Sequence, residues 1–170
     1  IKKDMKGFGS KDITKKYSTE KEAKSLQKNN LISDAFLLHS KGKIKEASEI
    51  YSYLIQNKIY DSRIFNNLGS IYYQFKQFDR AILLFDESIK KFPNSIEAYS
   101  NLANALVAKG RIDKAKNILN KAIKLNPKYL RSYSMLAGIL VGERNFEKAE
   151  IFLKKSLEIN PKDVNALVNL

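Results

Sequence analysis

The chain has 170 residues, of which 44% are hydrophobic and 29% are charged, a balance that is typical of a folded protein and excludes disorder throughout. It has no cysteine, which excludes disulfides and thiolate metal sites, and it contains neither an apolar run long enough to span a membrane nor the apolar core of a signal peptide. We therefore expect a soluble, cytoplasmic protein, and the formal charge of +13 raises the question of a nucleic-acid partner.

The first part of the chain is basic and has no helical period. Residues 1–18 are rich in Lys, Gly and Ser, so we expect a flexible basic leader there. Thr19 and Glu22 have the spacing of a capping box, which indicates a helix that continues toward Leu38. Residues 1–30 carry nine Lys against four acidic residues and so hold +5 of the charge, which leaves +8 spread over the rest of the chain.

Two interpretations of this charge stay open. A basic surface attracts nucleic acid or an anionic membrane, because Lys and Arg neutralise phosphates. Alternatively, the abundance of Lys and of Asn, of which there are 15, follows from an AT-rich coding sequence without selection for any ligand.

The rest of the chain is built from repeats of constant length. The three prolines, Pro93, Pro127 and Pro161, are evenly spaced, and they give a period of about 34 residues. The same frame places a small residue at repeat position 8, Ala at position 20 and a large apolar residue at position 24 in each complete unit. We therefore divide an array over 19–170 into the units 28–61, 62–95, 96–129 and 130–163 and a truncated unit, 164–170.

Each unit predicts a pair of antiparallel helices. Two amphipathic segments of about a dozen residues are separated near Gly42, Lys76, Gly110 and Arg144, which suits two helices joined by a short turn. Small residues at positions 8 and 20 let the two helices approach closely. The proline at position 32 ends the second helix, because it cannot donate to the helical ladder.

These residues resemble the tetratricopeptide repeat, which has the same period and a matching pattern of Leu, Gly, Tyr, Ala, Phe and Pro. The resemblance covers about residues 28–170 and implies an all-α fold, a right-handed α-solenoid of antiparallel helix pairs. The first unit departs from the pattern, with Asp34 in place of Leu and Ile59 in place of Pro, as a terminal repeat can. Because the last unit stops at Leu170 without a second helix, we expect a fragment of a longer, bacterial-type array or of a multidomain protein.

No residue pattern in the chain predicts catalysis. His39 is the only histidine and has no cysteine or second histidine with which to hold a metal or activate a nucleophile, so we expect a structural or surface role for it. Asp86 and Glu87 lie on the outer side of a predicted second helix, and the Gly-Phe-Gly stretch at 7–9 is too short for a phosphate-binding loop. We therefore expect no active site, no metal and no cofactor within these residues.

The resemblance implies a binding groove on the concave face of the array, lined by the first helix of every unit at repeat positions 2, 5, 6, 9, 12 and 13. The candidate peptide-binding residues at these positions are Arg63, Asn66, Asn67, Ser70, Tyr73, Gln74, Glu97, Ser100, Asn101, Asn104, Arg131, Ser134 and Asn169. Further positions of the same set are occupied by Ala108, Met135, Gly138 and Val141.

Position 6 of this surface holds Asn67, Asn101 and Asn169, and Met135 interrupts the series in the fourth unit. A carboxamide both donates and accepts, so one Asn per unit can bond the backbone of an extended peptide. This arrangement is similar to the asparagine ladder in the repeat arm of O-linked N-acetylglucosamine transferases. Asn is equally a favoured residue at this position in such repeats generally, and both interpretations stay open.

We expect a non-catalytic scaffold that binds a protein or peptide segment in this groove. The two-carboxylate clamp of chaperone-binding repeat proteins is poorly matched, because Ile32 and Phe36 occupy two of its positions. An alternative is a substrate-recruiting N-terminal arm of a larger glycosyltransferase or sulfotransferase, with chemistry beyond Leu170. A third hypothesis is an RNA-binding superhelix, but the groove positions of the three central units contain two Arg, one Glu and no Lys.

Overall fold

The structure, a computed structural model, describes residues 28–169 and is entirely helical over its ordered elements, which confirms the predicted all-α fold. The predicted leader at 1–18 and the capping box at Thr19 and Glu22 lie outside the described residues. The helices are α3 (Lys28–Ser40), α4 (Ile44–Gln56), α5 (Ser62–Gln74), α6 (Phe78–Lys91), α7 (Ile96–Ala108), α8 (Ile112–Leu125), α9 (Leu130–Gly142), α10 (Phe146–Ile159) and α11 (Val164–Asn169).

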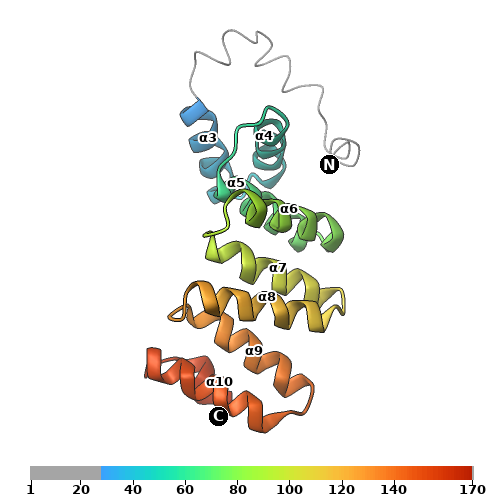
Figure 1. The fold of residues 1–170 in the computed structure, drawn as a ribbon. Helices are drawn as coiled ribbons and strands as arrows, with labels where there is room; N and C mark the ends of the chain where they lie inside the picture. The colour runs from blue at the N-terminus through green and yellow to red at the C-terminus, as the bar shows by residue number, and fades with distance from the viewer. Residues whose placement is uncertain (1–27, 170) are drawn as a thin grey trace.

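The helices stack in chain order as an α-solenoid (Figure 1). The first residues of α3, α5, α7, α9 and α11 are evenly spaced by one repeat period, and the first four of these helices each pack against the helix that follows. Each pair also contacts the next pair, and α5 touches α7 directly. The first helices of neighbouring pairs therefore lie next to one another, and they can build a shared surface.

The turn inside each helix pair uses the left-handed backbone region. Gly42, Lys76, Gly110 and Arg144 have φ angles of 73°, 58°, 70° and 60°. In each case the amide of the following residue bonds the carbonyl five residues earlier in the chain, at 2.8 to 2.9 Å, as in a Schellman motif. Glycine adopts this conformation without strain, whereas Lys76 and Arg144 do so at a cost of about 1 kcal/mol or more.

The core lies between the two helices of each pair and between neighbouring pairs. At repeat position 8 the small residues are fully or almost fully buried, and at Gly69 even a methyl group does not fit, since a Cβ there would lie 2.5 Å from Cε1 of Phe85. Phe85 itself is only 1% exposed, so its ring has no free space to move into.

Junctions between units use a proline and a tyrosine six residues apart. The Tyr99 hydroxyl donates to the Pro93 carbonyl, and the Tyr133 hydroxyl donates to the Pro127 carbonyl, both at 2.9 Å. Each proline ends one unit and each tyrosine belongs to the first helix of the next. These bonds therefore fix how consecutive helix pairs meet.

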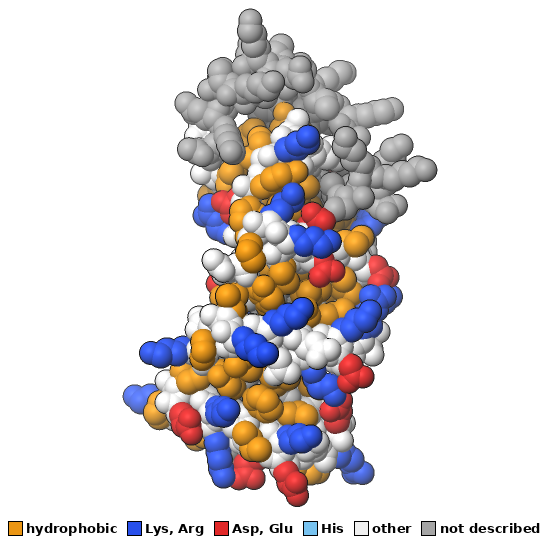
Figure 2. All heavy atoms as spheres, viewed as in Figure 1, with side chains coloured by type: hydrophobic (Ala, Val, Ile, Leu, Met, Phe, Trp, Pro, Cys, Tyr) orange, Lys and Arg blue, Asp and Glu red, His pale blue; other side chains and the backbone are white. Residues whose placement is uncertain are grey.

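The surface carries charges of both signs. In the view of Figure 2, Lys and Arg side chains are scattered over the visible face and interleaved with acidic and apolar ones rather than gathered into one patch. None of the helices in residues 28–169 combines the length and the apolar character that crossing a membrane requires.

Candidate functional site

A polar groove of about 720 Å³ crosses the first helices of four consecutive units. It runs from the second half of α3, along α5 from Ser62 to Ser70, to the first two turns of α7 and the first turn of α9. The residues that line it are Phe36, His39, Ser40, Ser62, Arg63, Asn66, Asn67, Ser70, Ser95, Glu97, Asn101 and Arg131. We call this set the polar groove.

The polar groove brings together seven of the candidate residues: Arg63, Asn66, Asn67, Ser70, Glu97, Asn101 and Arg131. Tyr73 and Gln74 lie at the far end of α5 and do not line it, and the Tyr73 ring instead packs against Phe78 at a centroid distance of 5.3 Å. The side chain of Asn169 lies outside the described part of the chain.

Two candidate serines turn toward protein rather than toward the groove. Ser100 has no exposed surface, and its buried hydroxyl has no hydrogen-bond partner among the described residues, so it belongs to the core and is not accessible to a ligand. Ser134 is partly exposed, and its hydroxyl lies 3.4 Å from the Leu130 carbonyl of its own helix. The part of α7 that can bind a ligand is therefore narrower than the predicted groove positions indicate.

His39 lines the polar groove, although no partner for it was predicted from the sequence. Its Nδ1 lies 3.4 Å from the Tyr51 hydroxyl, which donates to the Ala35 carbonyl at 3.3 Å and accepts from the Asn67 Nδ2 at 3.1 Å. In the neutral imidazole, Nδ1 donates to this hydroxyl in one tautomer and accepts from it in the other. Burial lowers the pKa of His39, which favours that neutral form.

The same network fixes Asn67. Its amide nitrogen is held by Tyr51, whereas its carbonyl oxygen makes no hydrogen bond in the described part of the chain. Burial raises the pKa of Tyr51, and the hydrogen bond from Asn67 opposes that rise. Asn67 therefore offers the groove an acceptor whose direction is set by the core, which is a form of preorganisation. His39 lies at repeat position 12, which is one of the predicted groove positions. That position could therefore have identified His39 as a groove residue from the sequence.

Asn66 is more deeply set than its neighbour. It is only 8% exposed, its amide nitrogen lies 3.4 Å from the Ser95 hydroxyl, and its carbonyl oxygen is buried without a partner among the described residues. Asn101, on the next first helix, is partly exposed and makes no side-chain hydrogen bond in the described range. The unbonded Asn66 oxygen is buried and not accessible to a ligand, so the amides that keep unused bonding capacity at the groove surface are those of Asn67 and Asn101.

Arg63 is already neutralised. Its guanidinium donates to both carboxylate oxygens of Asp61, at 3.0 and 2.6 Å, and stacks 4.8 Å above the Phe36 ring. The Asp61 carboxylate also accepts from the Arg63 backbone amide as the N-cap of α5, and these contacts lower the pKa of Asp61.

The two other charged residues of the polar groove are unpaired within the described range. Arg131 is exposed at the first turn of α9, and Glu97 is exposed at the first turn of α7. The groove as a whole is therefore close to neutral, with one free cation and one free anion among the described residues.

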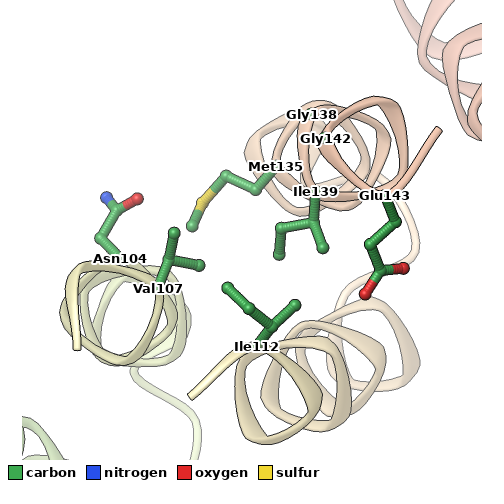
Figure 3. A pocket seen from close by; sticks show the side chains of 8 residues that line it. All are labelled: Asn104, Val107, Ile112, Met135, Gly138, Ile139, Gly142 and Glu143. Carbon is green, nitrogen blue, oxygen red and sulfur yellow. The ribbon is translucent and has the colours of Figure 1, made fainter. Parts of the chain in front are cut away.

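A second cavity lies between α7, α9 and the start of α8, and so shares α7 and α9 with the polar groove. It measures about 470 Å³, and its lining residues are Asn104, Val107, Ile112, Met135, Gly138, Ile139, Gly142 and Glu143, which we call the apolar pocket. Figure 3 shows Met135 and Ile139 of α9 pointing toward Val107 of α7 and Ile112 of α8. Asn104, predicted as a peptide-binding residue, lies at this pocket instead of in the polar groove.

Three family models, each described as a tetratricopeptide repeat, match this chain over residues 39–96, 72–138 and 130–163. No curated protein matches the sequence. Among solved structures, a tetratricopeptide repeat protein from Parabacteroides merdae is 21% identical with a TM-score of 0.74, over 84% of this chain and 57% of its own. This chain therefore spans little more than half of that protein's length.

Two further structures are similar at the level of the fold. MamA from Desulfovibrio magneticus is 17% identical with a TM-score of 0.71, over 81% of this chain and 78% of its own. The first repeat domain of Spaghetti (RPAP3), solved with the HSP90 peptide SRMEEVD bound, is 22% identical with a TM-score of 0.60, over 64% of this chain and 86% of its own.

Proposed function

This chain belongs to the tetratricopeptide-repeat family, and we propose that it is a non-catalytic protein-interaction scaffold that binds an extended peptide segment of its partner in the polar groove. The observation that carries the proposal is the pair of incompletely bonded amides, Asn67 and Asn101, in a groove that crosses four units. A similar fold binds a peptide in the RPAP3 structure, which supports this class of ligand.

The amides suit a peptide backbone better than a particular side chain. An extended peptide presents alternating N–H and C=O groups, and a carboxamide can serve both. The Asn67 oxygen can accept from a peptide N–H, while Asn101 has both of its amide groups free within the described range. Met135 replaces the amide in the next unit, so the backbone-reading part of the groove ends before α9.

The charge distribution supports a protein partner rather than nucleic acid. The groove contains two arginines, of which Arg63 is bound to Asp61, while Glu97 offsets Arg131. Nucleic-acid binding instead requires several free cations along the path of the phosphates. The two-carboxylate clamp also stays poorly matched, because Phe36, at one of its positions, packs under the Arg63 guanidinium.

The proposal can be tested with a random peptide library. A phage-displayed library of dodecapeptides is selected on the protein, and the affinity of a selected synthetic peptide is measured by fluorescence anisotropy. Asn101→Ala is expected to weaken binding about fivefold to thirtyfold, since it removes one or two hydrogen bonds of about 1 kcal/mol each. Asn117→Ala, at an exposed asparagine of α8 that lines neither cavity, is the matched control.

Equal affinities of the two variants and the wild type, with unchanged circular dichroism, would show that the peptide binds elsewhere. A selection that enriches no sequence would remove the peptide-binding function altogether.

A further inference from the structure

The apolar pocket has no role in the function proposed above, although its lining exposes apolar side chains that a ligand can cover. We infer that it is a second subsite of the same binding surface, which holds a bulky apolar side chain of the bound peptide two residues away from an acidic residue that pairs with Arg131. This inference rests on the proposed peptide-binding function. It adds the sequence class of the ligand, an acidic and an apolar residue separated by one position.

The pocket is open because two residues of α9 have no side chain. Gly138 and Gly142 are one helical turn apart, and a Cβ built on either of them would meet no atom within 4 Å. Packing therefore does not require glycine at these places, unlike Gly69, and neither has a positive φ angle. Glycine inside a helix is less favourable than alanine, so these two residues lower the stability of α9. Because they have no side chain, they also leave the pocket open.

The apolar side chains that line the pocket are exposed to water in the unbound protein. Val107 is 37% exposed, and Met135 and Ile139 are only partly buried. Figure 3 shows these three side chains turned toward the same space between α7 and α9. A volume of about 470 Å³ lies within the range of small ligand sites and is ample for one large aliphatic or aromatic side chain. Covering the lining removes apolar surface from water, which favours such an occupant.

The charges around the pocket decide what can enter it. Glu143, the charged residue in the lining, is bound by Lys116 at 2.7 Å, and Lys116 also pairs with Asp113 at 3.0 Å. The carboxylate is therefore already satisfied and does not call for a cationic ligand. Arg131, which lines the polar groove and is unpaired within the described range, can pair with an acidic group of the ligand.

The two subsites are continuous. On α9, Arg131 of the polar groove precedes Met135 of the apolar pocket by four residues, and on α7 Asn101 precedes Asn104 by three. Residues so spaced lie on one helix face with Cβ atoms about 5 to 6 Å apart. In an extended peptide, side chains two residues apart point the same way and are separated by roughly 6.5 Å. One peptide can therefore place an acidic side chain on Arg131 and an apolar one at the Met135 end of the pocket.

The test uses the same phage-displayed dodecapeptides. Enriched sequences are expected to carry Asp or Glu two positions from Leu, Ile, Met or Phe. Replacing that apolar residue with Ala in a synthetic peptide is expected to weaken binding about tenfold or more. Gly138→Leu, which fills the pocket, is expected to weaken binding of the peptide with the apolar residue to the same extent. It should not change the affinity of the Ala-substituted peptide. Asn117→Leu, which adds the same side chain on α8 outside both cavities, is the control and should change neither affinity.

The outcomes separate the two proposals. Peptides that depend on Asn101 but show no apolar preference, and that bind Gly138→Leu as tightly as wild type, would overturn the second subsite and leave the proposed function standing. No enrichment at all would overturn both. A wild-type dimer in sedimentation that Gly138→Leu converts to monomer would assign the pocket to a second copy of the chain and so refute the peptide subsite. Gly138→Leu should fold, since the added side chain meets open space and leucine favours helix.

Discussion

The contact between Gly69 and Phe85 gives a sharp test of how tightly the helix pairs are packed. On an exposed helix, replacing glycine with alanine raises stability by about 1 kcal/mol. At position 69 the new methyl group would lie 2.5 Å from Cε1 and 2.9 Å from Cδ1 and Cζ of Phe85, about 1 Å closer than carbon atoms tolerate. Because the ring is fully enclosed, relieving this overlap costs about 1 to 3 kcal/mol.

We therefore expect Gly69→Ala to lower the free energy of unfolding by up to about 2 kcal/mol, against the sign of helix propensity. A second substitution, at Phe85, tests whether contact with this ring causes the destabilisation. The third unit has Ala103 and Leu119 at the same two repeat positions. Phe85→Leu alone should destabilise by about 1 to 3 kcal/mol through lost burial, but Gly69→Ala should then be neutral or stabilising in that background. The expected coupling energy is about 1 to 2 kcal/mol.

Urea unfolding followed by far-UV circular dichroism measures all four proteins of this double-mutant cycle. Two results would refute the reasoning. Gly69→Ala could raise stability by the propensity amount, which would mean that the ring moves freely. The two substitutions could also be additive, which would mean that the cost of the methyl group does not come from Phe85.

Two further predictions concern stability. Lys76→Gly should raise the free energy of unfolding by about 1 kcal/mol, because it relieves a left-handed backbone, and an unchanged urea midpoint would argue against strain in that turn. The pKa of Asp61 is lowered in the fold by Arg63, so its contribution to stability is present above the ordinary carboxyl pKa near 4 and is lost as the pH falls through its lower folded value. Asp61→Asn, which keeps a capping oxygen, should flatten the decline of the urea midpoint from pH 5 to pH 2, and parallel curves would contradict this.

The period and the turns were readable from the sequence because they depend on local chemistry. The prolines set the frame, and the frame located the turns at Lys76 and Arg144, where no glycine marks them, as well as at Gly42 and Gly110. In a repeat array each unit faces nearly the same neighbours, so a residue type that recurs once per unit reports a recurring environment.

The details of the groove were less predictable, because they depend on how several helices meet. Ser100 fell on the polar side of a helical wheel, but α7 packs against α5, α6 and α8, and this crowding leaves a small residue such as serine enclosed. Tyr51 lies at repeat position 24, where the frame predicts a large apolar residue, and its side chain is fully buried. That its hydroxyl reaches Asn67 of the next unit depends on the offset between α4 and α5, which a periodic pattern does not encode.

The single-file stacking of helix pairs has a mechanical consequence. Each helix pair contacts mainly the pairs before and after it. Small changes at successive junctions can therefore add up to a bend of the whole array. The polar groove crosses α3, α5, α7 and α9, and it therefore spans three successive junctions. A peptide seated along it would act as a splint, and the distance between the two ends of the array would report its occupancy without any change inside a single helix pair.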